Sequence, residues 1–240
     1  MDRSADSAYS GDAAQIQDLF NRIAPVYDAF NQQLSLGLHQ IWKQMAVDWS
    51  RAQPGDTCLD LCCGSGDVTL LLSRRVGPSG QVYGVDFATA QLAIARQRSQ
   101  KVWPPLVVDW VEADVLALPF EDAYFDGATM GYGLRNVADI PASLKELRRV
   151  LKPGSAAAIL DFHRPASSLM QKFQQWYLST IVVPTAEAYG LGSEYAYISP
   201  SLDRFLSGSA QVSSALQSGF SDAVHYPIVG GMMGVLVATR

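Results

Sequence analysis

The chain has 240 residues and a mass of 26.0 kDa, which is long enough for one sizeable hydrophobic core and short for two. Its net charge of -5 and isoelectric point of about 5.1 argue against a protein that binds the phosphates of nucleic acids. The polar first fifteen residues predict no signal peptide. The weakly polar stretch 228–239 is shorter than the roughly 20 residues of a membrane-spanning helix, so we expect a buried strand or hairpin end there.

The N-terminal segment is predicted to be helical. Asp12 followed by Gln15 can start a helix, and apolar residues then recur at helical spacing until Pro25 interrupts them. A second segment over 27–49 leads to the turn at 54–56. We expect residues 12–53 to form a helical lid.

Strand and helix signals alternate from residue 57 onward. A helix is expected to begin at Asp139 and Pro141, to carry Leu151 on its apolar face and to end at 152–154. Further helices are expected over 67–76 and 89–100. Strands are expected over 58–61, 81–85, 107–112, 125–130 and 156–161, with two more after residue 219, the last of them over 235–238. The alternation predicts a largely parallel, doubly wound α/β sheet.

Residues 165–208 interrupt this rhythm. They are rich in aromatic side chains, and we interpret them as helical material inserted over the ligand edge of the sheet. Neither an internal repeat nor a linker is visible, so the chain 1–240 is interpreted as one domain.

The segment 57–67 is the most informative part of the chain. An apolar strand runs into a loop with Gly64 and Gly66, and a helix follows at once, which is how α/β proteins bring backbone amides to a nucleotide-like ligand. Thr69 stands where a dinucleotide fingerprint needs its third glycine. Asp60 inside the strand end suits a ligand with a positive charge, such as S-adenosylmethionine. A nicotinamide-dependent oxidoreductase and a non-catalytic cofactor-binding protein remain the competing interpretations.

All three cysteines, Cys58, Cys62 and Cys63, belong to this segment. An odd, clustered set without a distant partner predicts no disulfide framework, and its spacing together with three scattered histidines predicts no metal site. We interpret the cysteines as small apolar side chains that pack the strand end, in a reducing, cytoplasmic setting.

Polar residues follow the other predicted strands, where open α/β sheets bind ligands. Ser65 can add a hydroxyl to the glycine loop, and Asp86 ends the second strand, where a carboxylate can accept both ribose hydroxyls. Asp114 and Val115 can offer a carboxylate to an adenine amine and a backbone amide to the ring, although Asp114 also suits a loop or cap.

Arg135 and Asn136 follow the fourth strand and are expected to face the substrate; the competing interpretation of Arg135 is a surface ion pair. Another polar and aromatic stripe suits either core packing or a lid over a bound ligand. That stripe consists of Tyr27, Asn31, Ser35, His39 and Trp42.

Four spaced stretches together resemble the ubiquinone/menaquinone biosynthesis C-methyltransferases, and the resemblance extends from Phe20 over nearly the whole chain. The stretches are Tyr27-Asp28-x-Phe30-Asn31-x-x-Leu34-Ser35-x-x-x-His39-x-x-Trp42, Gly133-Leu134-Arg135-Asn136, Arg149-Val150-Leu151-Lys152-Pro153-Gly154 and Tyr195-x-Tyr197-Ile198-x-x-Ser201-Leu202-x-x-Phe205.

The resemblance implies a class I S-adenosylmethionine-dependent methyltransferase fold with a seven-stranded, mostly parallel sheet and helices on both faces. It implies cofactor contacts at Ser65, Asp86, Asp114, Val115 and Gly131, beside the loop residues Asp60, Gly64 and Gly66. Gly131 stands where relatives often have serine.

The resemblance also implies that Arg135 and Asn136 activate a quinol. An arginine, with a pKa above about 12, is a poor base. We therefore expect Arg135 to stabilise a developing phenolate, with Asn136 and a water carrying the proton. His163, which stands where relatives commonly have serine, is the alternative base.

The paired Cys62 and Cys63 resemble the photosynthetic branch of the family, which converts demethylphylloquinone to phylloquinone. The expected substrate is thus a prenylated naphthoquinol; demethylmenaquinol and a polyprenyl-methoxybenzoquinol are the alternatives. A prenylated substrate predicts a membrane-facing tunnel in 165–208. It also predicts that this cytoplasmic protein associates peripherally with the membrane. The sequence is compatible with a homodimer.

Overall fold

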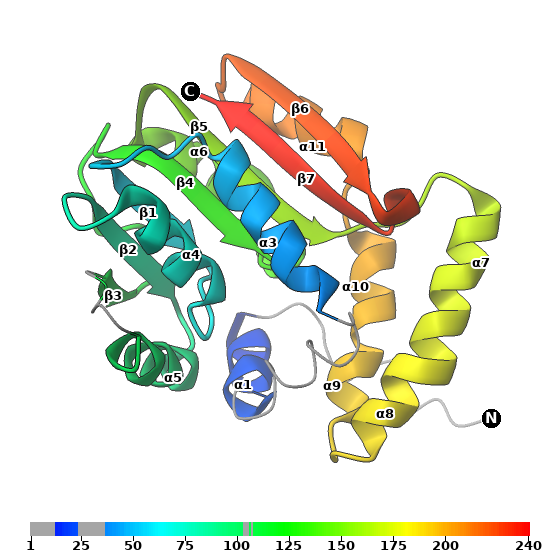
Figure 1. Cartoon of the computed structure of the whole chain (residues 1–240). Helices are drawn as coiled ribbons and strands as arrows, with labels where there is room; N and C mark the ends of the chain where they lie inside the picture. Colours follow the sequence, from blue (N-terminus) through cyan, green and yellow to red (C-terminus); the bar gives the residue numbers. More distant parts are fainter. Residues whose placement is uncertain (1–12, 24–36, 103–105, 107) are drawn as a thin grey trace.

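The computed structural model describes residues 13–23, 37–102, 106 and 108–240 (Figure 1). Within them a seven-stranded sheet has the order β3-β2-β1-β4-β5-β7-β6. Strands β1 to β5 pair in parallel, and β7 runs antiparallel to both β5 and β6. The predicted seven-stranded, mostly parallel sheet is thereby confirmed. The strands are β1 Thr57–Leu61, β2 Gln81–Asp86, β3 Val108–Glu112, β4 Phe125–Gly131, β5 Leu151–Phe162, β6 Asp222–Ile228 and β7 Met233–Thr239.

Strand order reverses between β1 and β4, which both start from the middle of the sheet. Crossovers leave in opposite directions from this point, so a crevice opens at the carboxyl ends of the two strands. Both strands are almost entirely buried, as expected for parallel strands covered on two faces. The crevice therefore rests on a rigid floor.

Helices cover both faces of the sheet (Figure 1). On one face α3 contacts α4, β4 and β5, while α4 and α5 pack on β1 to β3. On the other face α11 packs against α6, β6 and β7. These helices are α3 Leu38–Trp49, α4 Asp67–Val76, α5 Thr89–Gln100, α6 Ile140–Val150 and α11 Gly208–Gln217.

Part of the predicted lid lies within the described residues. Helix α1, Ala13–Ile23, packs against α5, and Asn21 Oδ1 accepts a hydrogen bond from Ala90 N at 3.2 Å. Its Ile16 side chain is almost completely buried. Tyr27, Asn31 and Ser35 lie outside the described residues, so the expected stripe is seen only at His39 and Trp42.

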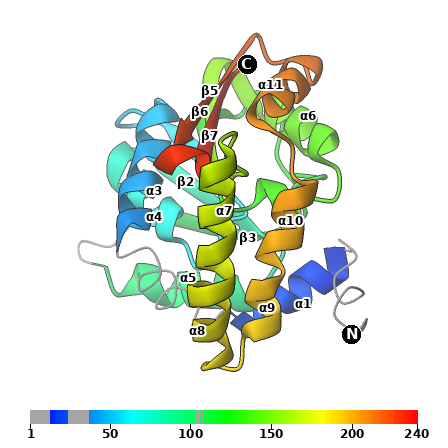
Figure 2. The ribbon, with the colours of Figure 1, turned by 90° about the vertical axis from the view of Figure 1, so that its right-hand side faces the viewer.

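The segment after β5 forms a separate column of helices (Figure 2). Tyr177 to Val183 continue the helix without a break through a π-helical turn. Val182, Ala186, Leu191 and Tyr195 form a small core inside the column. Its elements are α7 Ser168–Tyr177, the π-helical turn Leu178–Val182, α8 Val183–Glu187, α9 Gly192–Ala196 and α10 Ile198–Arg204. In the part of the chain that the structure describes, we find no helix with the length and apolarity needed to span a bilayer.

The boundary between α6 and β5 differs from the prediction. Asp139 caps α6 as expected, accepting a hydrogen bond from Ala142 N at 2.9 Å, but the helix ends at Val150 and Leu151 begins β5. The register jumps from Phe125–Leu151 to Gly127–Ala156. The residues 152–154, predicted to separate helix and strand, therefore lie in a bulge of β5, where a proline is tolerated.

Candidate active site

The loop after β1 lies at the topological switch point. Cys62, Gly64 and Gly66 all have left-handed φ values, of 50°, 54° and 88°. The loop is closed by hydrogen bonds from Cys63 N to Val85 O and from Gly66 N to Cys63 O, each 2.9 Å long. The chain therefore turns within five residues and starts α4 directly above the sheet.

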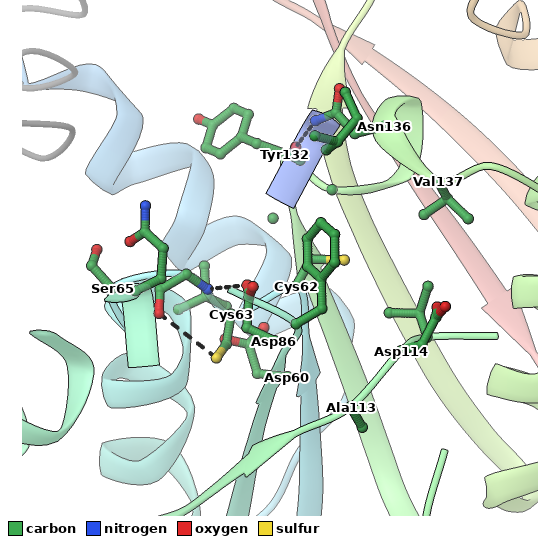
Figure 3. A pocket seen from close by; sticks show the side chains of 18 of the residues that line it. Asp60, Cys62, Cys63, Ser65, Asp86, Ala113, Asp114, Tyr132, Asn136 and Val137 are labelled. Atoms are coloured by element: carbon green, nitrogen blue, oxygen red, sulfur yellow. Dashed lines mark hydrogen bonds between the residues drawn. The ribbon is translucent and has the colours of Figure 1, made fainter. Parts of the chain in front are cut away.

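A cavity opens above this loop (Figure 3). It encloses about 1040 Å³, open solvent included, a size that suits a drug-sized or cofactor-sized molecule. We call it the first cavity. Eight of the ten predicted site residues line it: Asp60, Gly64, Ser65, Asp86, Asp114, Val115, Gly131 and Asn136.

Gly66 does not line the first cavity. A Cβ atom at this position would lie 2.6 Å from Trp110 Cη2 and 3.2 Å from Ala95 Cβ. Both the left-handed φ and the close approach of the indole ring require glycine here. The residue thus serves the packing of the loop against α5 and β3.

Asp60 is completely buried beneath the first cavity. Its carboxylate accepts hydrogen bonds from Thr69 Oγ1 at 2.6 Å and from Thr129 Oγ1 at 2.8 Å. Burial nevertheless raises the pKa of Asp60 from 3.8 to about 7, because the charged form loses its hydration. A positive charge in the cavity would favour the ionised form.

Asp86 ends β2 at the edge of the first cavity. Gly64 N donates to one carboxylate oxygen and Ala88 N to the other, both at 2.8 Å, and Figure 3 shows the bond from the loop amide. Burial raises the pKa of this carboxyl group as well. Each oxygen keeps a second lone pair, so the fixed carboxylate can still accept hydroxyl groups of a ligand.

The remaining predicted cofactor residues are held by local contacts. Asp114 Oδ1 accepts a hydrogen bond from Leu116 N at 2.9 Å, so the residue caps its loop and lines the cavity at the same time. Ser65 Oγ accepts a hydrogen bond from Arg98 Nη1 at 3.0 Å. Arg98 also pairs with Asp67 at the start of α4, which fixes the serine above the helix.

The three cysteines are free thiols packed around the strand end. Cys62 and Cys63 line the first cavity, whereas Cys58 packs into the hydrophobic core below it. Burial is the main cause that raises the pKa of Cys62 and Cys63 well above the ordinary thiol value, and the nearby charge of Asp86 adds to it.

A second cavity lies beside the first, between α3 and the helical column that follows β5. It encloses about 970 Å³, open solvent included. Its lining is predominantly apolar and aromatic. It consists of His39, Trp42, Lys43, Tyr132, Arg135, Phe162, Gln174, Tyr177, Leu178, Val182, Tyr195, Ile198, Leu202, Val229, Met232 and Met233.

Among the lining residues, Lys43 and Tyr132 border both cavities. Lys43 is buried, donates to Asp67 Oδ2 at 2.6 Å and lies 5.8 Å from the centre of the Tyr132 ring. Tyr132 has a left-handed φ of 62°, which is uncommon for a bulky residue and marks stored strain. Its amide donates to Leu160 O at 2.7 Å, so the chain holds the ring between the two spaces.

Arg135 and Asn136 lie on the short 3₁₀ turn Leu134–Asn136 directly after Tyr132. Arg135 is buried rather than on the surface; its Nη1 lies 2.5 Å from Asp161 Oδ1, and its guanidinium lies 5.1 Å from the centre of the Phe162 ring. Arg135 lines the second cavity, whereas Asn136 lines the first. The two neighbours are thus divided between the two cavities.

Asn136 Oδ1 is buried and makes no hydrogen bond to any described residue. Its amide group donates weakly to Tyr132 O at 3.4 Å. A buried carbonyl oxygen without a donor costs free energy, so its position at the first cavity indicates a ligand or water that donates to it.

Comparison with known proteins identifies the chain. The model of the ubiE/COQ5 methyltransferase family matches residues 8–240. The chain belongs to the ubiE/COQ5 methyltransferase family. The enzyme is 64% identical to a 2-phytyl-1,4-naphtoquinone methyltransferase from Trichormus variabilis, over 94% of this chain and 99% of that protein. It is 52% identical to a chloroplastic 2-phytyl-1,4-beta-naphthoquinone methyltransferase from Arabidopsis thaliana, over 92% of this chain and 86% of that protein.

Solved structures share the fold of this methyltransferase. A SAM dependent methyltransferase from Aquifex aeolicus has a TM-score of 0.57 and 20% identity, covering 78% of this chain and 82% of that one. The [4+2]-cyclase SpnF has a TM-score of 0.59 and 16% identity, covering 94% and 96%. A cyclase on the same fold shows that the architecture alone does not give the reaction, so the activity rests on the family.

The cofactor of this methyltransferase is S-adenosylmethionine. The residues around the first cavity fit that molecule. The buried Asp60 suits its positive charge, Asp86 has lone pairs for hydroxyl groups, and Asn136 offers an acceptor to which no described residue donates.

His163, the alternative base, lines neither cavity in this methyltransferase. Its Nε2 is 2.9 Å from His225 Nε2 and 2.8 Å from Gln211 Nε2, in a buried cluster beneath β6 and α11. Burial lowers the pKa of both imidazoles, for His225 to about 4. The interpretation of His163 as the alternative base is therefore contradicted, because its imidazole faces Gln211 and His225 and not a cavity.

Sequence reasoning missed Lys43 and Tyr132. Lys43 directly follows Trp42 of the N-terminal signature, and Tyr132 precedes the Gly133-Leu134-Arg135-Asn136 stretch. Their adjacency to both signatures was the available signal. Their joint position between two cavities depends on the packing of α3 against β4 and β5.

Proposed function

We propose that this methyltransferase C-methylates the ring of a prenylated naphthoquinol, with reduced 2-phytyl-1,4-naphthoquinone as acceptor and the quinol of phylloquinone as product. The printed names of the relatives from Trichormus variabilis and Arabidopsis thaliana support this substrate. The apolar second cavity supports an acceptor with a long hydrocarbon tail.

One observation carries the proposal: Arg135 and Asn136 face different cavities that share Lys43 and Tyr132 as their border. A cofactor in the first cavity and an aromatic ring in the second would meet at this border. The guanidinium of Arg135 and the amide of Asn136 lie on opposite sides of this border. The guanidinium can stabilise negative charge, and the amide can orient a water that accepts a proton.

Arg135 stabilises the negative charge that develops on the quinol oxygen as it loses its proton. Asp161 and the Phe162 ring fix the guanidinium, so its charge is preorganised and needs no rearrangement during the reaction. Because an arginine keeps its own proton, the proton goes to a water that Asn136 Oδ1 orients. The deprotonated quinol then has a nucleophilic ring carbon next to the charged oxygen.

When bound, S-adenosylmethionine would supply an electrophilic methyl group for this ring carbon, with S-adenosylhomocysteine as the leaving product. Loss of the hydrogen of the methylated ring carbon to solvent as a proton restores the aromatic ring as the quinolate, whose oxygen then takes a proton from solvent to give the quinol. Lys43 and Tyr132 hold the border at which ring and methyl group meet. Tyr177, Leu178 and Leu202 pack against the hydrocarbon tail.

The test uses the purified chain with S-adenosylmethionine and 2-phytyl-1,4-naphthoquinone that has been chemically reduced beforehand. We expect a product heavier by one methylene group, detected by mass spectrometry, and no turnover of the unreduced quinone. Demethylmenaquinol and a polyprenyl-methoxybenzoquinol are run in parallel. Faster turnover of the benzoquinol than of either naphthoquinol would refute the proposed ring type.

A further inference from the structure

Helix α7 carries a row of large apolar side chains that point away from the protein. Leu169, Phe173 and Trp176 follow one another at intervals of four and three residues, so they share one face of the helix. Their exposed fractions are 73%, 45% and 51%. The Phe173 and Trp176 rings contact each other, with centroids 5.8 Å apart. We call these three residues the α7 stripe.

The opposite side of the same helix lines the second cavity. Gln174, Tyr177 and Leu178 contribute to its wall. Figure 2 shows α7 as the outermost element on this side of the molecule. A single helix therefore separates the apolar interior of the second cavity from the α7 stripe.

The charges around the stripe differ from those of the rest of the chain. The protein carries a net charge of -5, yet residues 162–186 contain neither Asp nor Glu, the longest such stretch in the sequence. The exposed Lys172 lies within it, as does Arg164, which forms an exposed ion pair with Asp203 at 3.5 Å. This face thus combines an apolar row with the positive charge of Lys172, on a chain whose net charge is negative.

We propose that the α7 stripe docks on the surface of an anionic lipid bilayer, with Trp176, Phe173 and Leu169 at the boundary of headgroups and acyl chains and Lys172 among the lipid phosphates. Aromatic side chains favour this depth of a membrane, and helices with an apolar face beside basic residues lie in its plane. Docking there brings the wall of the second cavity against the lipid in which a prenylated quinol is dissolved. The purpose of the docking, access to a prenylated quinol, rests on the proposed function. The binding of the α7 stripe to lipid does not depend on that function.

The test measures binding of the full chain to vesicles without any quinol. Vesicles of phosphatidylcholine with phosphatidylglycerol are compared with phosphatidylcholine alone in a flotation assay. We expect binding to the anionic vesicles, and a loss of about tenfold or more in the variant Leu169→Ser, Phe173→Ser, Trp176→Ser. The variant Lys172→Glu should weaken binding to anionic vesicles several-fold, and added salt should diminish this difference.

Matched controls lie on other helices. Leu216→Ser removes an exposed leucine on α11, and Lys145→Glu reverses an exposed lysine on α6. Both should float like the wild type. If the triple variant does not fold, Trp176→Ser alone and Lys172→Glu provide the same comparison.

Three results would overturn the inference: a wild type that does not float with anionic vesicles, stripe variants that float like it, or a wild-type dimer in solution that dissociates in the triple variant. The last result would assign the stripe to an interface between two copies. Turnover of a short-chain naphthoquinol without vesicles separates the two proposals. This turnover should be absent if the proposed function is wrong, and it should be unchanged in a variant that has lost only membrane docking.

Discussion

The buried carboxyl group of Asp60 leads to a prediction about cofactor affinity. Its pKa is raised from 3.8 to about 7 by burial, so in the free protein it titrates in the neutral range. We expect S-adenosylmethionine, with its positive charge, to bind the ionised form. At pH 6 about one-tenth of the protein is ionised at Asp60 and at pH 8 about nine-tenths, so the Kd should fall about tenfold between them.

Isothermal titration calorimetry at pH 6, 7 and 8 measures this change, and Asp60→Asn is the matched variant. The amide retains the neighbouring Thr69 and Thr129 as partners but carries no charge. The Kd of the variant should be higher at pH 8 and nearly independent of pH, apart from the titration of the ligand itself. An equal pH dependence in both proteins would refute the reasoning.

The carboxyl group of Asp60 also makes the stability of the folded protein depend on pH. Because the pKa of Asp60 is raised in the folded state, its contribution to stability is fully present below pH 3.8 and is lost as the pH rises to about 7. Asp60→Asn should therefore be more stable than the wild type above pH 7 in the absence of cofactor. Urea denaturation at pH 5 and pH 8 measures the difference.

Three further substitutions test other parts of the site. Arg135→Gln should lower turnover about a hundredfold or more while the Kd for S-adenosylmethionine changes less than about threefold, and near-normal turnover contradicts its role. Asp86→Ala should instead raise that Kd about tenfold to a hundredfold, and an unchanged Kd in calorimetry argues against a cofactor contact. Gly66→Ala should destabilise the fold by about 1–3 kcal/mol, since its Cβ would lie 2.6 Å from Trp110. Gly77→Ala meets open space, so in the same thermal melts it measures the cost of the backbone alone, because a φ of 70° and a ψ of -170° are strained for alanine.

Local sequence signals were sufficient to predict much of the sheet and several of the residues that line the first cavity. The expected helices over 67–76 and 89–100 have the observed bounds. Gly66 and Gly77 flank the first of them, and Pro78 follows directly. Asp60, Asp86 and Asp114 follow or end parallel strands, and the carboxyl ends of such strands meet at one edge. Their assembly around the first cavity thus follows from topology alone.

Other features depend on contacts between distant segments. The residues 152–154 have the composition of a helix stop, but pairing with β4 and β7 incorporates them into a long strand with a bulge. His163 is close in sequence to β5, yet His225 and Gln211 draw its ring to the other side. The position of Lys43 between two cavities arises only when α3 packs on the sheet.

The paired thiols at the first cavity have a consequence for the chemistry of the enzyme. S-adenosylmethionine is an alkylating agent, and a thiolate is a far better nucleophile than a thiol. Cys62 and Cys63 line the cavity, but burial and the neighbouring charge of Asp86 keep their pKa values well above the ordinary range. At neutral pH both remain protonated. The protein thereby tolerates two sulfur atoms beside its own methyl donor without becoming a competing acceptor and inactivating itself.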